Sequence, residues 1–236
     1  MDLLLISNST NPGEEYLGWP RPHIKNFLAS RNIKRVLFIP FAGVSFSYDT
    51  YEEKVNNVFK NLGFEIYSIH HEKDPLKAVH DAEAIAVGGG NTFQLVREMQ
   101  KQGLMDAIRE RVLSGVPYMG WSAGSNVACP SLKTTNDMPI VEPLSFNCMG
   151  LIPFQINPHY LDAHPENHGG ETREQRIEEF LIANQNIYVA GLREASFLLY
   201  ENERLILKGN RPLRVFKYDE EPQEFKPGED IQFLMA

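Results

Sequence analysis

The sequence has few cysteines, no excess of basic residues and no long apolar run. Cys129 and Cys148 are the only cysteines among 236 residues, which excludes a disulfide framework and favours a reducing compartment. The formal net charge of −8 argues against nucleic acid or an anionic membrane as a partner, because both attract clustered lysine and arginine. The apolar start, residues 3–7, is too short for a signal peptide or a membrane span. We therefore expect a cytoplasmic protein with neither kind of partner.

Short apolar segments alternate with amphipathic ones along most of the chain. Strands are expected at residues 3–7, 36–41, 64–69, 84–87 and 116–119, with helices between them. Repeated strand–helix units predict an α/β fold with a parallel, doubly wound sheet, and the length favours one domain over residues 1–236. Residues 197–200, 205–207 and 213–216 are joined by turn-forming residues and predict a C-terminal antiparallel β-ribbon at the sheet edge.

The segment Gly120-Trp121-Ser122-Ala123-Gly124 follows the strand expected near residue 119. Its G-x-S-x-G pattern is typical of a sharp strand–turn–helix in which the glycines leave the serine hydroxyl exposed. A helix beginning near residues 126–129 would direct free N–H groups towards that hydroxyl. Ser122 is therefore a candidate nucleophile, which requires a base, an acid that orients the base, and an oxyanion site.

Among the seven histidines, His159 is the best candidate for the base. It follows the apolar segment 152–156, and Pro158 stiffens the approach, so a rigid loop tip at the carboxyl edge of the sheet is expected. His164 and His168 are the fallback candidates in the next loop. The remaining histidines are interpreted as solvated or partly buried side chains: His23, His70, His71 and His80.

Two carboxylates compete as the orienting acid. Asp137 lies in a polar loop between the serine motif and His159, and Glu194 follows the strand expected at residues 187–191. Spacing along the chain leaves the choice between them open. A carboxylate is needed there to hold the histidine tautomer and to stabilise the imidazolium.

The glycine run at residues 88–90 follows another strand and offers unobstructed backbone N–H groups. The N–H groups of Gly89 and Gly90, together with that of Ala123, are expected to form an oxyanion site. A phosphate cradle is the alternative, but neither G-x-G-x-x-G spacing nor a P-loop lysine is present. The candidate serine therefore favours the oxyanion interpretation.

A helix is expected to begin near Thr172, which has capping-box spacing with Gln175. Arg173 and Arg176 are both expected on or beside its inward face, where an arginine could bind a substrate carboxylate, and Arg173 is the first candidate. The alternative is an arginine at the helix surface that pairs with Glu171 or Glu179.

Several motifs, taken together and in order, closely resemble the peptidase E family of aspartyl dipeptidases, which is related to cyanophycinases. The resemblance weakens only after about residue 209. The motifs are Gly88-Gly89-Gly90-Asn91-Thr92, Gly120-Trp121-Ser122-Ala123-Gly124, Thr134-Thr135-Asn136-Asp137-Met138-Pro139, Gln155-Ile156-Asn157-Pro158-His159 and Glu171-Thr172-Arg173-Glu174-Gln175-Arg176.

The resemblance implies a flavodoxin-like, three-layer sheet similar to that of class I glutamine amidotransferases. It implies a serine exopeptidase that removes an N-terminal aspartate, chiefly from Asp-Xaa dipeptides, with Ser122 as nucleophile and His159 as base. It matches the third triad member to either Asp137 or Glu194, and we favour Glu194 because it ends a strand. Arg173 would then bind the aspartyl side chain.

The substrate's α-ammonium group would be bound by Asp137 or by the carbonyl of Asn91. No metal or cofactor is expected for this chemistry, and small peptides are the expected partners. A homodimer is left open by the sequence. Two alternatives remain: a cyanophycinase-like hydrolase of β-aspartyl-arginine polymer, and a non-catalytic binding domain of the amidotransferase-like fold.

Overall fold

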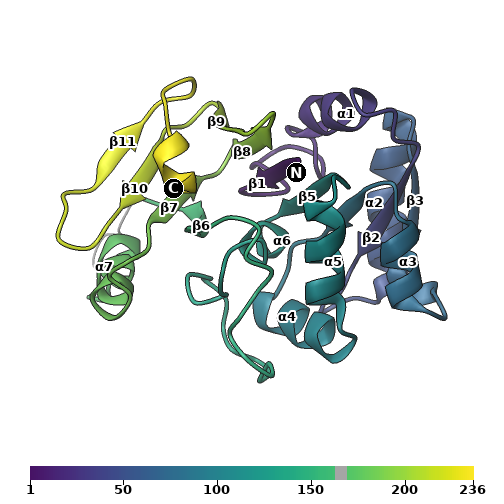
Figure 1. The fold of residues 1–236 in the computed structure, drawn as a ribbon, viewed down its shortest axis with the longest axis horizontal. Coiled ribbons are helices and arrows are strands. Elements are labelled where there is room, and N and C mark those ends of the chain that lie inside the picture. The colour runs from purple at the N-terminus through teal and green to yellow at the C-terminus, as the bar shows by residue number, and fades with distance from the viewer. Residues whose placement is uncertain (163–168) are drawn as a thin grey trace.

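The computed structural model describes residues 1–162 and 169–236, and its largest element is a seven-stranded sheet (Figure 1). The strands lie in the order β3-β2-β4-β5-β1-β8-β9. Strands β1 to β5 pair in parallel, and β8 and β9 extend the sheet antiparallel beyond β1. The predicted α/β class with a mainly parallel central sheet is confirmed. The strand bounds are β1 Leu3–Ile6, β2 Arg35–Ile39, β3 Glu65–Ser68, β4 Ile85–Val87, β5 Tyr118–Trp121, β8 Ser196–Glu201 and β9 Arg204–Gly209.

Helices cover both faces of this sheet, and the alternation of side chains along each strand decides which face they cover. In β1, Leu4 and Ile6 belong to the apolar cluster that includes α1 (Arg21–Ala29) and α2 (Tyr48–Leu62). Leu3 and Leu5 point to the opposite face. That face is covered by α3 (Pro75–Asp81), α4 (Thr92–Lys101) and α5 (Leu104–Leu113). Because both faces are buried, the parallel strands are almost wholly apolar.

A second sheet stands beside the first, drawn in green and yellow in Figure 1. Its order is β11-β10-β7-β6, with β6 and β7 parallel and the other pairs antiparallel. Helix α7 (Arg173–Ala183) packs Ile177 and Leu181 against this sheet. The bounds are β6 Gln155–Tyr160, β7 Val189–Arg193, β10 Leu213–Phe216 and β11 Gln223–Phe225.

The second sheet corrects one part of the predicted topology. The segments at 197–200 and 205–207 form the β8–β9 hairpin at the edge of the first sheet, as predicted. The segment 213–216 is β10, however, and pairs with β7 in the second sheet. Between the two, Pro212 has no N–H for a ladder, and the Arg211 N–H donates to the Ser196 hydroxyl (3.2 Å), so the chain leaves the first sheet. Apolar alternation predicts the faces of a strand, not its neighbours.

None of the helices within residues 1–162 and 169–236 combines the length and apolar character needed to cross a bilayer. The cysteines at 129 and 148 are free thiols, the first of them buried.

Candidate active site

Ser122 lies at the tip of a tight turn between β5 and the single-turn helix α6 (Ala123–Asn126). Its backbone has φ of 54°, a left-handed conformation that non-glycine residues rarely adopt. A Cβ on Gly124 would collide with the carbonyl oxygen of Val87 at the end of β4, so the turn packs against the neighbouring strand only with glycine there. The helix begins at Ala123, which corrects the predicted start near residue 126.

His159 lies in a bulge of β6 and contacts Ser122 from there. Strand β6 belongs to the second sheet and follows Ser122 in the sequence. Its Nε2 lies 2.9 Å from the Ser122 Oγ, and its Nδ1 lies 2.7 Å from Oε1 of Glu194, which directly follows β7. Because a carboxylate only accepts hydrogen bonds, the Nδ1–H donates to Glu194, and Nε2 is left to accept the serine proton. Both His159 and Glu194 are about two-fifths exposed (38% and 40%), so a small molecule can reach the serine.

Asp137 stands apart from this hydrogen-bonded chain. Its Oδ2 accepts hydrogen bonds from the N–H (2.7 Å) and hydroxyl (2.6 Å) of Thr92, and from the hydroxyl of Thr135 (3.1 Å). Thr92 is the first residue of α4, so the carboxylate lies at the positive end of that helix. The structure thus places one of the two competing acids against His159 and the other at a helix terminus.

The glycine loop after β4 lies against the serine turn. A Cβ on Gly89 would lie 3.0 Å from the Cβ of Ser122. Within residues 1–162 and 169–236, the N–H groups of Gly89, Gly90 and Ala123 donate no hydrogen bond to the protein. Free backbone donors beside a serine hydroxyl are what an oxyanion site requires.

Tyr51 of α2 supports this loop from behind. Its hydroxyl donates to the Gly89 carbonyl (2.9 Å) and accepts from the Trp121 Nε1–H (3.2 Å). Burial raises the pKa of Tyr51 to about 12, so the hydroxyl keeps its proton and remains a donor. The Tyr51 hydroxyl therefore fixes both the glycine loop and Trp121, the residue before Ser122.

Arg173 is the first residue of α7, and the predicted capping box between Thr172 and Gln175 is present. Arg173, Asp137 and Asn157 line a cavity of about 170 Å³. Burial and the neighbouring Arg176 lower the pKa of Arg173, and Asp137 acts in the opposite direction. No ion pair of Arg173 is found in the part of the chain that the structure describes.

Two other candidate residues make structural contacts. Arg176 also lines the cavity of Arg173, but its side chain is exposed and pairs with Glu171 (3.5 Å), which corrects its expected place on or beside the inward face. The Asn91 side-chain oxygen caps α4 by accepting from the Gln94 N–H (3.1 Å), so that carbonyl is already engaged. The fallback bases His164 and His168 lie outside the described residues.

Ser7 and Asn8, two fully buried polar residues directly after β1, were not identified from the sequence. The Ser7 hydroxyl donates to the Leu192 carbonyl (2.8 Å) and accepts from the His159 N–H (2.9 Å). Oδ1 of Asn8 accepts from the N–H of Ala195, the residue after Glu194 (2.9 Å). The sequence feature that could have indicated their role is a pair of hydrogen-bonding side chains at the carboxyl end of a buried strand.

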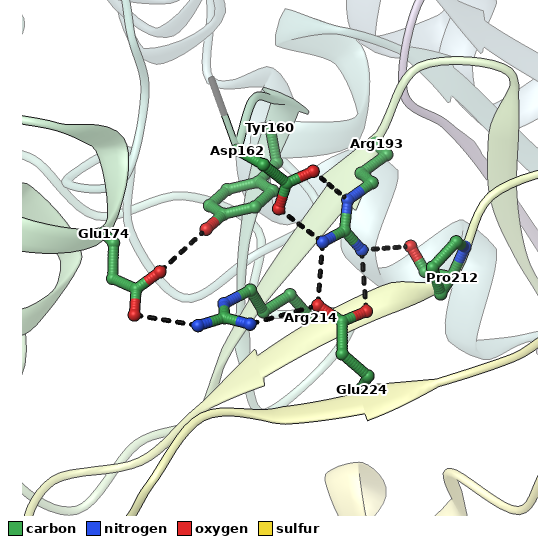
Figure 2. Close-up of polar contacts among 7 residues, drawn as sticks. All are labelled: Tyr160, Asp162, Glu174, Arg193, Pro212, Arg214 and Glu224. Carbon is green, nitrogen blue, oxygen red and sulfur yellow. Dashed lines mark hydrogen bonds and ion pairs between the residues drawn. The ribbon is translucent and has the colours of Figure 1, made fainter. Parts of the chain in front are cut away.

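Behind Glu194, its neighbour Arg193 anchors an ion-pair network (Figure 2). Arg193 is 7% exposed and makes bidentate contacts with Asp162 (2.5 and 2.8 Å) and Glu224 (2.7 and 2.9 Å). Arg214 then joins Glu224 (3.2 Å) to Glu174 of α7 (2.8 Å). These contacts connect β7, the segment after His159 and the helix that begins with Arg173.

Comparison with known proteins shows the family to which this chain belongs. The family model for peptidase family S51 matches residues 3–208. A peptidase E of Nostoc sp. is 52% identical over 233 residues, which cover 99% of this chain and 96% of that protein. A peptidase E of Salmonella typhimurium is 47% identical over 228 residues, covering 97% and 99%.

A similar fold occurs in the crystal structure of a peptidase from an acI-B1 Actinobacterium. Its TM-score is 0.70 at 19% identity, over 98% of this chain and 96% of that one. The family model spans residues 3–208 and the two relatives cover nearly the whole chain, and both ranges include the segments that carry Ser122, His159 and the glycine loop. This chain belongs to peptidase family S51 and is a hydrolase.

Proposed function

We propose that this protein is a serine exopeptidase that removes N-terminal aspartate, chiefly from Asp-Xaa dipeptides. The observation that carries the proposal is the continuous chain of hydrogen bonds from Ser122 through His159 to Glu194. That arrangement supplies a nucleophile, a base and an orienting acid, which acyl transfer requires.

In this mechanism Ser122 Oγ attacks the carbonyl carbon of the aspartyl residue while His159 Nε2 takes the hydroxyl proton. Glu194 accepts the Nδ1–H throughout and stabilises the imidazolium. His159 then gives its proton to the leaving amine, the C–N bond breaks, and an aspartyl ester remains on Ser122. Water, deprotonated by the same nitrogen, attacks the ester and releases aspartate.

The tetrahedral oxyanion would be bound by the backbone N–H groups of Gly89, Gly90 and Ala123. Their lack of partners within the described residues supports this role, since they need no rearrangement to donate. The hydrogen bond from Tyr51 to the Gly89 carbonyl holds the loop in place.

Arg173 would bind the β-carboxylate of the substrate aspartate. Its partial burial and its position in the cavity shared with Asp137 support this assignment. The substrate's α-ammonium would lie against Asp137, whose Oδ1 accepts no hydrogen bond within the described residues. Asn91 is the weaker candidate, because its side-chain oxygen already caps α4.

The proposal includes a cytoplasmic location and small peptides as the physiological partners. The two free thiols fit a reducing compartment. We keep the single domain over residues 1–236 as a prediction; the apolar cluster shared by the two sheets, which contains Leu5 and Ile156, supports it.

Hydrolysis of aspartyl p-nitroanilide and of Asp-Xaa dipeptides by wild type and Ser122→Ala tests the proposal. We expect the variant to fold and to lose activity by about 10³-fold or more, because the acyl-enzyme cannot form. Full activity in Ser122→Ala would overturn the assignment. Preference for a β-linked Asp–Arg substrate over Asp-Xaa would favour the cyanophycinase-like alternative instead.

A further inference from the structure

Four metal-ligating side chains converge away from Ser122, between α2 and the turn after β3. Asp49 and Glu52 lie three residues apart at the start of α2, and His70 and His71 are consecutive in the 3₁₀ turn η1 (Ile69–His71). Their four ligand atoms all lie within 4.8 Å of one another. Residues three apart on a helix share a face, so both carboxylates point towards the two imidazoles.

Three of the six distances between ligand atoms are slightly shorter than those of a tetrahedral site, and no pair is farther apart than 4.8 Å. His70 Nε2 lies 3.0 Å from Asp49 Oδ1, and His71 Nε2 lies 3.2 Å from that oxygen and 2.9 Å from Glu52 Oε2. Ligands about 2.0–2.2 Å from Zn²⁺ are about 3.4 Å from each other in a tetrahedron. To admit the ion, these three pairs would move apart by a few tenths of an ångström and any wider pair would move closer. The exposed Asp49 and His71 (73% and 56%) are free to make such movements.

A hydrogen bond behind His70 orients it as in many metal sites. Its Nδ1 lies 2.6 Å from the Ser68 Oγ, and that hydroxyl lies 3.4 Å from the Phe38 carbonyl oxygen, its other acceptor. When Ser68 donates to the carbonyl, Nδ1–H donates to Ser68, and the Nε2 lone pair faces the Asp49 oxygen. When Ser68 donates instead to Nδ1, the shorter of its two contacts, the Nε2–H of His70 donates to Asp49, and that contact is satisfied without an ion. A divalent ion would take the place of that proton and contact all four ligand atoms at once.

We propose that Asp49, Glu52, His70 and His71 bind a divalent transition-metal ion of the zinc class. Two imidazoles and two carboxylates suit Zn²⁺ and Co²⁺, while Ca²⁺ and Mg²⁺ prefer all-oxygen sites. The carboxylates neutralise the charge of the ion. Because the protein fills all four positions, the site is structural and joins α2 to the end of β3.

Metal binding would affect the helix turn that supports the glycine loop. Tyr51 lies between Asp49 and Glu52 in the sequence, and its hydroxyl donates to the Gly89 carbonyl. An ion that binds only the folded state raises the melting temperature, by an amount that grows with the logarithm of the free ion concentration once this exceeds Kd. The proposal does not depend on the reaction assigned to Ser122.

The test uses untagged, chelator-treated protein and the metals alone. Calorimetric titration with Zn²⁺ is expected to show one equivalent bound and a higher Tm, and Co²⁺ is expected to give the intense visible bands of a four-coordinate ion. Titration with Ca²⁺ or Mg²⁺ is expected to show no binding. The variants His70→Gln, His71→Gln and Asp49→Asn should each weaken Zn²⁺ binding by about tenfold or more.

The matched control is His80→Gln, because His80 also contacts a carboxylate, that of Asp81 at 3.0 Å. This variant should bind Zn²⁺ like wild type. Equal Zn²⁺ affinity in wild type and in all three cluster variants would overturn the proposal and leave an ordinary ion-pair cluster. Loss of binding in His159→Gln alone would place the ion at the serine site and would also overturn it.

Discussion

Glu194 and Asp137 are carboxylates of similar chemistry in contrasting surroundings. Glu194 directly follows β7 of the second sheet and accepts a hydrogen bond from Nδ1 of His159 (2.7 Å). Asp137 lies in the loop after α6 and accepts from the N–H and hydroxyl of Thr92 at the start of α4. One carboxylate is placed to act on the histidine, and the other is placed beside the cavity of Arg173.

The two sheets contribute different residues to the same candidate site. The first sheet carries Ser122 and the glycine loop at the carboxyl ends of β5 and β4, while the second carries His159 and Glu194 on adjacent parallel strands. Ser7, at the end of β1, joins the two through its bonds to the His159 N–H and the Leu192 carbonyl. This division of the site between two sheets can be tested by substitution.

Glu194→Gln is expected to lower kcat by about 10³–10⁴-fold, whereas Asp137→Asn lowers it by less than about tenfold. The glutamine amide carries no charge and can itself donate, which favours the His159 tautomer with its proton on Nε2. That tautomer cannot accept from Ser122. Steady-state kinetics on aspartyl p-nitroanilide measures both variants.

Asp137→Asn should instead raise KM, because Asp137 is assigned to the α-ammonium group. The reverse pattern, with a large kcat loss in Asp137→Asn and a nearly normal Glu194→Gln, would contradict the assignment of the orienting acid. Equal losses in both would show that the two carboxylates are not functionally divided.

Arg173→Met is expected to lower kcat/KM for aspartyl substrates by about 10²–10³-fold and to leave the weak activity on alanyl substrates unchanged. A charged substrate group that loses its buried partner costs about 2–5 kcal/mol. The matched control is Arg35→Met, since Arg35 is also exposed and pairs with a glutamate, Glu65, and does not line the cavity of Arg173. An unchanged preference for aspartate in Arg173→Met would exclude it as the specificity residue.

The parallel sheet was predictable from the sequence because strands that are buried on both faces are apolar along their whole length. Ser122 and His159 were identified as candidates because glycine or proline residues beside them indicate a sharp turn or a rigid loop tip. Spacing along the chain left Glu194 and Asp137 open, and Glu194 was favoured only because it ends a strand, since the choice depends on which strand lies opposite the serine. The second sheet was missed for the same reason. Pairing between distant strands, such as β7 with β10, leaves no local pattern.

Ser7→Ala is expected to lower kcat by about tenfold with little change in KM, and to cost about 1–3 kcal/mol in the free energy of unfolding. The change leaves the N–H of His159, a residue with a strained φ of 53°, without its acceptor. Kinetics and urea unfolding measure the two effects. Ser9→Ala is the control, because within the described residues the hydroxyl of Ser9 hydrogen-bonds only with that of Thr10 (3.3 Å). A Ser7→Ala enzyme that loses stability but keeps full kcat would leave Ser7 with a purely structural role.

The smallest expected effect concerns the ion pairs of Arg193 beside Glu194. Hydrogen bonds from Arg193 lower the pKa of Asp162. Burial alone would raise the pKa of Glu224, but hydrogen bonds from Arg193 and Arg214 outweigh it and lower it. Groups with a lowered folded-state pKa stabilise the protein above their unfolded values of about 4, and this stability is lost as pH falls through the folded values.

Urea unfolding of wild type between pH 7 and pH 3 should therefore show a loss of about 1 kcal/mol or less for each of these partly exposed carboxylates. Arg193→Met should flatten that pH dependence, because the carboxylates then titrate at ordinary values. An Asp162→Asn, Glu224→Gln double variant should be less stable at pH 7 than Arg193→Met, since it leaves a buried guanidinium unpaired.

The same variants separate an effect on catalysis from an effect on stability. If Arg193→Met lowers kcat while Glu224→Gln does not, Arg193 acts on Glu194 through the backbone of β7, and the ion pairs only hold Arg193 in place. If both variants keep the kcat of wild type, the ion-pair network contributes to stability alone, and Glu194 is positioned by Asn8 and Ser7.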